Sequence, residues 1–534
     1  MAQSDVFQQG EQYIKAFYDG EIDTPERLVQ ALDNKWFRLN TLYKIKPKPP
    51  DEEDDSSAEE AFQPIVPFQP NWAQRDFWSK KHNRNLILKA RQFGFTTLEM
   101  IDSLDTSLFT PHSNIGIIAH TKGDATSIFN DKIKVAYECV PEYWLEMFDE
   151  VGLLWPTPVV DQAGGYRFSN GSKLDVSVSY RGGTLKKLHV SEFGSICKNN
   201  PLAAEEIVSG AFEAVPLKGG LTIESTAEGR EGYFYEYSQT ALKNALSGKK
   251  PGLLDFKIFF YPWFKCPDYF LDDDEVIVTE DMKEYFDAVE AKTKQMLTLP
   301  QKKWYIKKQE TLKDKMKSQY PSTPEEAFEG STQGAYYAKQ MNALRKKGQI
   351  RHIPHDFRLP VYTFWDLGRR DSTAIWFMQY VWGEYRLIRY YENSGENIQF
   401  YCREIRKFEY DLSTVYLPHD GDVVDYSSGD NRSRKEIVQA MGFPVEVVTR
   451  VPDKLEAIQA VRDILPMCWF DEALCEKGIL ALESFRKEWD AKLGKWKDKP
   501  LHDWASHGAS AFEQLARGFT ATDGQQMSYE PEVV

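Results

Sequence analysis

The sequence predicts an α/β protein in which two blocks of alternating strands and helices follow one another along the chain. Three observations lead to this prediction: short β-rich runs recur from residue 85 onward, helical stretches separate most of them, and a long charged helical region divides the two blocks. Alternation of strands with helices is typical of parallel sheets connected by crossover helices. At roughly 150 residues per domain, the 534 residues suggest about three domains.

Composition and charge exclude several classes of protein. Hydrophobic residues make up 42% of the chain and aromatic residues 14%, which excludes general disorder, collagen and coiled coil. The N-terminus has no basic and apolar leader, and no apolar run approaches about 18 residues, so we expect neither secretion nor a membrane span. The six cysteines form no CxxC pair and are expected to be reduced thiols. The net charge of −15 argues against simple adsorption to DNA, so any DNA contact must use local basic surfaces.

The order of elements follows from local patterns. One or two helices are expected within the first 50 residues, followed by an acidic run at 51–62 that is typical of a solvated linker. Residues 240–350 are predicted to be mostly helical, and the polar tail after residue 521 to be loose. The expected strands are 85–89, 114–119, 174–178, 185–190 and 221–224 in the first block, and 361–366, 373–381, 385–391 and 414–417 in the second.

The segment after the first expected strand has the parts of a phosphate-binding loop. Strand 85–89 leads through Gly94 into a helical stretch that opens with Thr96 and Thr97. In such loops backbone N–H groups and the helix N-terminus hold phosphates, and the first hydroxyl binds Mg²⁺. Against the usual pattern GxxxxGK[ST], Lys89 stands in place of the first glycine and Phe95 in place of the lysine. Without context, the segment also fits a plain strand–turn–helix connection.

Two later strand ends and one upstream residue provide that context. Residues 186–194 form an apolar strand that ends at Glu192, which could polarise an attacking water, although Ser191 replaces the usual preceding Asp. Upstream of the loop, the Gln74 amide could read both a donor and an acceptor on adenine. Strand 221–224 leads into three small residues that can link hydrolysis to a moving element: Ser225, Thr226 and Ala227.

Acidic residues in the second block predict a metal-dependent nuclease with a ribonuclease-H-like fold. Asp366 and Asp420 each follow a strand, and Asp503 starts a late helix. Converging carboxylates of this kind bind two hard cations, which activate water and stabilise the leaving oxygen of a phosphodiester. Asp371 could be an auxiliary ligand instead. Three histidines invite a zinc site, but their spacing shows no convergence, and either structural roles or the support of a metal ligand are favoured: His419, His502 and His507.

Taken in order, several segments resemble the large terminase subunit of tailed double-stranded-DNA bacteriophages and their prophages. The resemblance covers most of the chain, and the ordered set is specific although several pieces alone are not. The segments are 36–43 (WFRLNTLY), 68–74 (FQPNWAQ), 91–97 (RQFGFTT), 181–194 (RGGTL…HVSEFG), 224–229 (ESTAEG), 320–328 (YPSTPEEAF), 417–421 (LPHDG) and 503–508 (DWASHG).

The resemblance implies a fold, an activity and a set of partners. It implies a P-loop ATPase of the additional-strand, catalytic-Glu class, followed by a ribonuclease-H-like nuclease. Such proteins use ATP and Mg²⁺, with Mn²⁺ able to substitute in the nuclease, to cut concatemeric DNA and pump it into a prohead. The implied partners are double-stranded DNA, the portal protein, the small terminase subunit, the prohead and further copies of the chain in a ring, expected to be a pentamer. The implied location is the cytoplasm of a bacterial host, transiently at the portal, without a membrane.

The resemblance also assigns roles to individual residues. Lys89 is similar to the family's displaced phosphate lysine, Arg91 to its in-loop arginine and Glu192 to its catalytic glutamate, with Ser225, Thr226 and Ala227 as the coupling motif. The chain departs from the family at the third nuclease acid, where it has Ser506 and Ser510, so Asp503 is the remaining local acid. The expected nucleotide-binding residues are Gln74, Lys89, Arg91, Gly94, Thr96 and Thr97, with Thr96 also a metal ligand, and the expected nuclease metal ligands are Asp366, Asp420 and Asp503.

These expectations define a domain plan and leave two alternatives open. The plan places a helical segment and acidic linker at 1–62, an ATPase core at 63–240, a helical lid or linker subdomain at 241–355, a nuclease at 356–520 and a flexible tail at 521–534. One alternative is a helicase-like ATPase and nuclease that is not linked to capsids. The other is a scaffold protein with an inactive nucleotide site, for which the missing lysine at position 95 is the best support.

Overall fold

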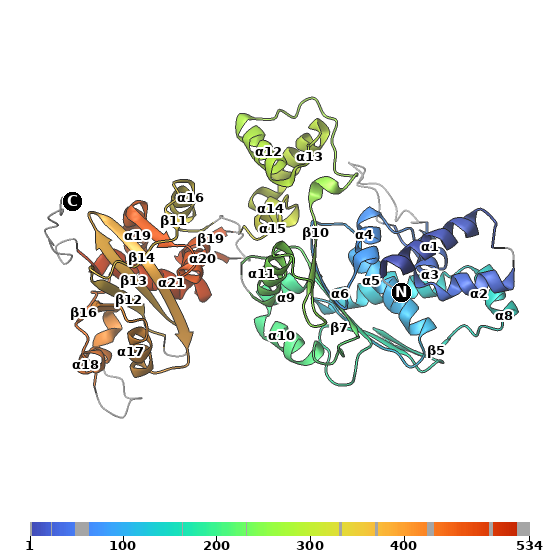
Figure 1. Cartoon of the computed structure of the whole chain (residues 1–534), viewed down its shortest axis with the longest axis horizontal. Coiled ribbons are helices and arrows are strands. Elements are labelled where there is room, and N and C mark those ends of the chain that lie inside the picture. The colour runs from blue at the N-terminus through green and yellow to red at the C-terminus, as the bar shows by residue number, and fades with distance from the viewer. Residues whose placement is uncertain are drawn as a thin grey trace. The chain divides into compact units, whose positions relative to one another are not determined.

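The computed structural model describes residues 3–22, 24–47, 64–162, 164–230, 232–329, 334–368, 372–423, 432–490 and 495–520. The chain divides into two compact units, residues 1–330 and 331–534 (Figure 1). The expected acidic linker at 51–62 and tail at 521–534 lie outside the described residues. The expected domain boundaries stay predictions, and each unit is considered by itself below.

The first unit is built on an eight-stranded sheet. Its strands are β3 (Arg84–Lys89), β4 (Asn114–Ile118), β5 (Pro158–Gln162), β6 (Gly165–Phe168), β7 (Lys173–Ser177), β8 (Lys187–Ser191), β9 (Gly220–Ser225) and β10 (Lys257–Tyr261). They lie in the order β10-β3-β9-β8-β4-β7-β6-β5, and the six strands from β10 to β7 are parallel to one another. Strand β9 therefore lies between the strand that precedes the phosphate loop and the strand that leads to Glu192. This is the additional-strand arrangement that the resemblance implies.

The α-helices described in the first unit precede, connect and follow these strands, and only some of them cover the faces of the sheet. They are α1 (Gln3–Tyr18), α2 (Pro25–Asp33), α3 (Lys35–Thr41), α4 (Trp72–Lys80), α5 (Phe95–Phe109), α6 (Lys122–Ser127), α7 (Val135–Glu138), α8 (Glu142–Glu150), α9 (Phe193–Asn199), α10 (Pro201–Glu206), α11 (Gly232–Leu246), α12 (Glu280–Thr293), α13 (Leu299–Leu312), α14 (Met316–Gln319) and α15 (Pro324–Ala327). Short helical turns are the π-helices η1 (Ile128–Lys134) and η2 (Ile207–Ala211), and the 3₁₀ turns η3 (Trp263–Lys265) and η4 (Lys313–Lys315). Strands β1 (Lys44–Ile45) and β2 (Val66–Pro67) form a small separate pair.

Alternating side chains along the strands build two separate cores. On β3, Ile87 packs with α4 and α5, whereas Leu86 and Leu88 point to the opposite face, which α9 and α11 cover. Figure 1 shows the two helical layers, with α1 to α5 on one side of the sheet and α9 to α11 on the other. Because both faces are covered, the parallel strands read as near-continuous apolar runs. This is why the sequence revealed them.

Two features of the first unit differ from the expectations. The first 50 residues contain three helices rather than one or two, and α3 buries Trp36 and Phe37 completely. Strand β10 pairs with β3, so the sheet extends beyond residue 240, the expected end of the ATPase core. The short run 257–261 contains two phenylalanines and a tyrosine, but its charged surroundings favour a helical region when the sequence is considered alone.

The second unit has a seven-stranded mixed sheet. Its strands are β11 (Ile350–Arg351), β12 (Val361–Asp366), β13 (Ser372–Val381), β14 (Glu384–Ser394), β15 (Leu412–Leu417), β16 (Val445–Val447) and β17 (Cys468–Asp471), in the order β11-β17-β14-β13-β12-β15-β16. Strands β12, β13 and β14 form an antiparallel meander, and β15 adds to β12 in parallel. A meander extended by parallel strands is the arrangement expected of a ribonuclease-H-like domain.

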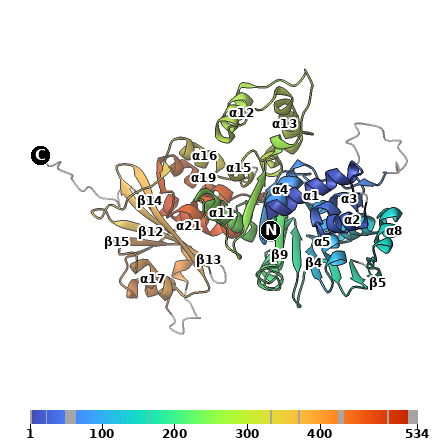
Figure 2. The same cartoon turned by 45° about the vertical axis from the view of Figure 1, so that its right-hand side comes forward.

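Helices again cover both faces of the sheet (Figure 2). They are α16 (Ala338–Lys346), α17 (Ile398–Arg406), α18 (Arg434–Ala440), α19 (Lys454–Ile464), α20 (Glu476–Ser484) and α21 (Trp504–Gly518), with 3₁₀ turns η5 (His419–Asp422) and η7 (Leu465–Met467). One core lies under α16, α19, α20 and α21, and the other under α17 and α18. A hairpin of β18 (Lys487–Asp490) and β19 (Lys495–Pro500) precedes α21.

Two expectations from composition can be compared with the structure. All six cysteines are free thiols, and five of them are buried. Among the described residues, no helix is both long enough and apolar enough to cross a membrane.

Candidate active sites

The loop between β3 and α5 has the backbone geometry of a phosphate cradle. Gln92 and Gly94 both have left-handed backbone angles, with φ of 67° and 71°. Gly94 precedes the first turn of α5, and no side chain caps that helix end. The first N–H groups of α5 therefore have no partner within the helix, and they favour an anionic ligand.

Neighbouring side chains hold this loop in place. Gln74 Nε2 donates to the carbonyl of Gly94 at 2.7 Å, and Gln74 Oε1 accepts from the N–H of Asn71 at 2.8 Å. The amide of Gln74 is thus engaged at both ends, and its side chain is buried. These hydrogen bonds hold the Gln74 side chain against the loop, and its expected contact with adenine stays a prediction.

Arg91 is also tied to its surroundings. Its N–H donates to the carbonyl of Gln319 at 3.0 Å, and its Nε donates to the side-chain oxygen of the same residue. The hydroxyl of Tyr269 donates to the carbonyl of Arg91 at 2.5 Å. These contacts connect the loop to α14 and to the segment before α12. The expected contact of Arg91 with nucleotide stays a prediction.

Lys89 lies between two carboxylates at the carboxyl edge of the sheet. Its Nζ is 3.5 Å from Glu192 Oε1 and 3.2 Å from Glu224 Oε2. Burial alone would lower the pKa of Lys89, but the two carboxylates outweigh it and raise the pKa. The lysine is therefore held charged, in a position to meet phosphate. Its expected role as the phosphate lysine, in place of the one missing at Phe95, stays a prediction.

Glu192 lies directly after β8 in a left-handed conformation, with φ of 52°. The hydroxyl of Ser225 donates to Glu192 Oε2 at 3.2 Å. The first residue of the expected coupling motif thus contacts the expected catalytic glutamate. Thr226 and Ala227 follow β9 and are both buried.

Glu224 is a site residue that the sequence analysis missed. It is fully buried on β9, in register with Ser191 of β8. Thr96 Oγ1 donates to Glu224 Oε1 at 2.5 Å, and His189 Nε2 lies 3.3 Å from the same oxygen. Burial opposes the charged form, yet Lys89 and His189 hold the pKa of Glu224 below its usual range. Its position at a strand end was visible in the sequence, but the neighbours on β3 and β8 were not.

A second lysine at the loop was also missed. Lys132 lies on the π-helix η1, and its Nζ donates to Thr97 Oγ1 at 2.9 Å. Burial and the nearby charge of Lys89 lower the pKa of Lys132. No local pattern in the sequence signals this contact, because it joins residues 35 positions apart through a π-helix.

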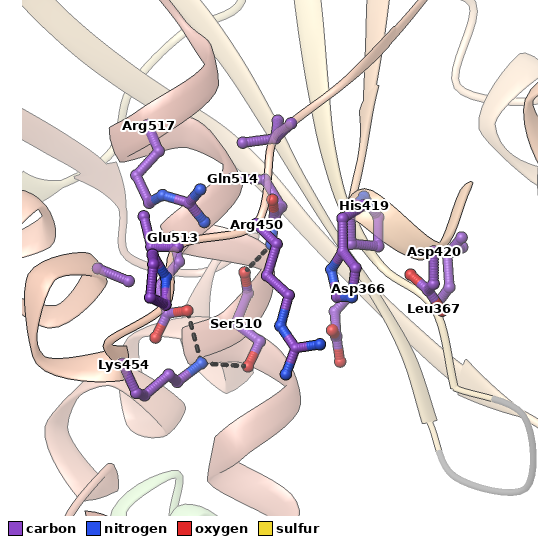
Figure 3. Close-up of a pocket in the computed structure, with 15 residues that line it drawn as sticks. Asp366, Leu367, His419, Asp420, Arg450, Lys454, Ser510, Glu513, Gln514 and Arg517 are labelled. Carbon is purple, nitrogen blue, oxygen red and sulfur yellow. Dashed lines mark hydrogen bonds and ion pairs between the residues drawn. The ribbon is translucent and has the colours of Figure 1, made fainter. Parts of the chain in front are cut away.

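The second candidate site is a cavity of about 360 Å³ in the second unit (Figure 3). Asp366 and Asp420 both line it, since they follow the adjacent parallel strands β12 and β15. The structure therefore brings these two expected ligands to one place. The other charged or ring-bearing residues of the lining include His419, Arg450, Lys454, Glu513 and Arg517.

Each of the two aspartates has a nearby basic group. Asp420 Oδ2 is 2.9 Å from Arg434 Nη1, and Asp366 Oδ2 is 3.2 Å from His507 Nδ1. His507 thus lies beside an expected metal ligand, in line with one of the two roles that the sequence analysis favoured for it. Asp371, the expected auxiliary ligand, lies outside the described residues.

Asp503 lies at the start of α21. Its carboxylate caps α21 by accepting from the N–H of Ala505 at 3.1 Å, and burial raises its pKa. Asp503 is not among the described residues that line the cavity. Its expected convergence with Asp366 and Asp420 on a metal stays a prediction.

Glu513 is the acid that α21 presents to the cavity. It lies on the same helical face as Ser510 and Arg517, which also line the cavity. Burial raises the pKa of Glu513, and Lys454 opposes this rise through an ion pair of 2.6 Å. The sequence analysis considered positions 506 and 510 of this helix but not Glu513, which lies one turn further along.

The residues of the cavity fit a divalent cation only in part. Among the described residues, no group of three or more histidines, cysteines or acids is arranged to hold a metal ion by itself. Asp366 and Asp420 would supply carboxylate oxygens. Mg²⁺ commonly binds one or two carboxylates and completes its shell with water and substrate phosphate. The two aspartates fit that mode, with the remaining ligands coming from the substrate and solvent.

Comparisons with known proteins point to one group of solved structures. No family model and no curated protein matches the chain. A large terminase from a thermophilic bacteriophage, in complex with ADP, is 13% identical, covers 82% of this chain and 94% of its own, and gives a TM-score of 0.27. The ATPase domain of the Thermus phage P74-26 large terminase is 17% identical over 48% of this chain and 94% of its own, with a TM-score of 0.30. The large terminase nuclease of the thermophilic phage G20c with bound cobalt is 10% identical over 34% of this chain and 96% of its own, with a TM-score of 0.26.

All three are large terminases or domains of them, the family that the sequence motifs resemble. Their identities are below 25% and their TM-scores below 0.5, so these likenesses carry no conclusion about activity. The functional conclusion rests instead on the residues and sheet order described above.

Proposed function

We propose that the chain is a DNA-packaging enzyme that hydrolyses ATP with its first unit and cuts DNA with its second. The observation that carries the proposal is the position of Lys89, held charged beside Glu192 and Glu224 at the carboxyl edge of a parallel sheet. Ligands of open α/β sheets bind at that edge, outside the carboxyl ends of the strands. The additional strand β9 and the phosphate loop support ATP as the ligand.

Each residue of the first site has a chemical task in this proposal. Lys89 and the free N–H groups of α5 bind the phosphates, and Thr96 supplies a hydroxyl oxygen to Mg²⁺. Glu192 orients and polarises the attacking water as general base. Ser225 donates a hydrogen bond to Glu192, so a change at Glu192 during hydrolysis would alter this contact and with it the position of the segment after β9.

In the second site, Asp366 and Asp420 would hold the divalent cations that cleave a phosphodiester bond. The cations supply charge stabilisation and an activated water when bound. Arg450 and Arg517 line the same cavity and can neutralise the phosphates of the DNA backbone. A locally basic rim is needed because the chain as a whole carries a charge of −15.

The partners follow from the proposed activity. Double-stranded DNA would be moved by the first unit and cut by the second, and a portal, a prohead, a small terminase subunit and a ring of identical chains complete the packaging machine. A bacterial cytoplasm is the corresponding location. These partners rest on the resemblance of the sequence segments and remain to be tested.

The proposal can be tested with the purified chain, linear and supercoiled DNA, ATP and either Mg²⁺ or Mn²⁺. We expect Glu192→Gln to bind ATP with little hydrolysis while plasmid cutting persists. We expect Asp366→Asn to stop cutting while ATP hydrolysis persists. Loss of both activities in either variant would contradict the assignment of one activity to each unit. ATP-driven protection of DNA from nuclease on addition of portal-bearing proheads would distinguish packaging from a helicase-like activity.

A further inference from the structure

The nucleotide site lacks an acid where the sequence pattern calls for one. Ser191 ends β8 in the position of the usual Asp before the catalytic glutamate. A neutral hydroxyl there cannot replace the charge of a carboxylate near a divalent cation. A site that binds magnesium-bound nucleotide needs another acidic group close to the loop hydroxyl.

A carboxylate is present on the adjacent strand. Glu224 on β9 is in register with Ser191, and the Ser191 hydroxyl lies 3.4 Å from Glu224 Oε1. The same carboxylate oxygen accepts the hydrogen bond of Thr96 at 2.5 Å. The side chain of Glu224 is completely buried, so its position is fixed by the strands and helices around it.

The hydrogen bond from Thr96 has a consequence for cation binding. Because the hydroxyl gives its hydrogen to Glu224, its lone pairs are free to face the loop. A carboxylate that accepts from a ligand orients it and increases its basicity. Removal of such a supporting group typically lowers metal affinity by about 10- to 100-fold.

We propose that Glu224 is the positioning carboxylate of the nucleotide site. It acts through Thr96 and takes over from the acid that is missing at Ser191. The site then prefers the magnesium complex of a nucleoside triphosphate to the free nucleotide. This inference deepens the proposed ATPase function and rests on it, because it names the residue through which that site would couple nucleotide to magnesium.

A purely structural role for Glu224 makes a different prediction. Glu224 also pairs with Lys89, so its loss could weaken folding or nucleotide binding regardless of the cation. A positioning role through Thr96 affects the gain in affinity that Mg²⁺ provides. The decisive quantity is therefore the ratio of nucleotide affinities with Mg²⁺ and with EDTA, which does not depend on turnover.

The experiment compares four full-length proteins: wild type, Glu224→Gln, Ser191→Ala and the double variant Ser191→Asp/Glu224→Gln. Binding of a fluorescent non-hydrolysable ATP analogue is measured with Mg²⁺ and with EDTA. We expect Glu224→Gln to lose about 10- to 100-fold of the magnesium-dependent gain. We expect Ser191→Ala, the matched control, to retain the gain, and the double variant to regain most of it because a carboxylate returns one strand away.

The magnesium-dependent gain in affinity decides whether Glu224 has a positioning role or a purely structural one. An unchanged magnesium-dependent gain in Glu224→Gln, or a folded double variant that does not recover it, overturns the proposal. If Glu224→Gln loses its circular dichroism or melts at the assay temperature, the magnesium-dependent gain in affinity of the double variant is compared with that of wild type instead. Wild type that binds the analogue in neither condition would contradict the proposed ATPase itself, which is a different failure.

Discussion

Replacing Lys89 with methionine tests whether the charge at the centre of the first site is balanced as the structure indicates. The lysine side chain is 7% exposed and its partner Glu224 is fully buried, so little water can replace the lost cation. Removing one partner of a buried ion pair costs about 3–5 kcal/mol, because the other charge is left uncompensated. We therefore expect Lys89→Met to destabilise the first unit by about that amount at neutral pH.

The expected shift in melting temperature follows from the size of the unit. Unfolding entropy is about 2.1 cal/mol/K per residue, which gives about 0.7 kcal/mol/K for residues 1–330. A loss of about 3–5 kcal/mol then lowers the melting temperature by about 4–7 °C. Thermal unfolding of the full chain, followed by circular dichroism, can measure this shift. Lys186→Met, an exposed lysine next to β8, is the matched control and should change stability by less than about 0.5 kcal/mol.

The pH dependence has a defined sign. In wild type the pKa of Glu224 is depressed, so its contribution to stability is present above the ordinary glutamate pKa and is lost as pH falls through the folded-state value. In Lys89→Met only His189 and Thr96 still oppose the effect of burial, so we expect a higher pKa for Glu224 than in wild type and the largest destabilisation at neutral pH. The difference between the two proteins should shrink as pH falls toward about 4.3.

A double substitution provides the strictest check. Lys89→Met/Glu224→Gln removes both charges and should recover a large part of the lost stability, because no buried charge remains from this ion pair. A melting temperature of Lys89→Met within about 1 °C of wild type would refute the reasoning. A double variant less stable than the single one would refute it as well.

Three further predictions concern the loop, the coupling contact and the late helix. Gly94→Ala should lower both the melting temperature and the ATP affinity, because the φ of Gly94 is 71° and a Cβ would lie 2.9 Å from Gln74 Nε2. Thermal unfolding and binding of the ATP analogue measure these two effects. An unchanged affinity would contradict the role of the loop. Ser225→Ala should reduce the ATPase kcat by about 10- to 100-fold, the value of a hydrogen bond to a charged group, with ATP affinity retained. Asp503→Ala should lose about 0.5–2 kcal/mol of stability, because its helix cap is missing, but should still cut plasmid. Glu513→Gln should alter plasmid cutting, because Glu513 lines the cavity. Cutting lost in Asp503→Ala and unchanged in Glu513→Gln would support Asp503 as the third acid.

Much of the fold could be predicted because its cause is local. The runs 85–89 and 361–366 are apolar, and both became central strands with the expected bounds to within a residue. The glycine turn and the hydroxyl-bearing helix start at 94–97 were equally local signals. Strand 257–261 was missed because five residues in a charged region carry too little pattern to outweigh their surroundings.

Candidate site residues could be named from the sequence only where a single segment of the chain contains both the reactive side chain and the strand or turn that positions it. Glu192 and Asp366 were proposed because each lies at the end of a strand, and strand ends meet at one edge of a parallel sheet. Lys132 reaches the loop from a π-helix, and Glu513 reaches the cavity along a face of α21. Asp503 was chosen because it is the remaining acid of the segment 503–508, and the structure adds that its carboxylate accepts from a backbone N–H at the start of α21.

The sequence by itself determined the α/β class, the two blocks, the phosphate loop and the strand-end acids, because these depend on periodicity and on turns within a few residues. Only the tertiary structure decided which charges share a site. Sheet order put β9 between β3 and β8, and so placed Glu224 against Lys89 and Thr96. Which strand neighbours which depends on how crossover helices pack over the whole unit, and burial then makes every charge depend on the partner that this packing provides.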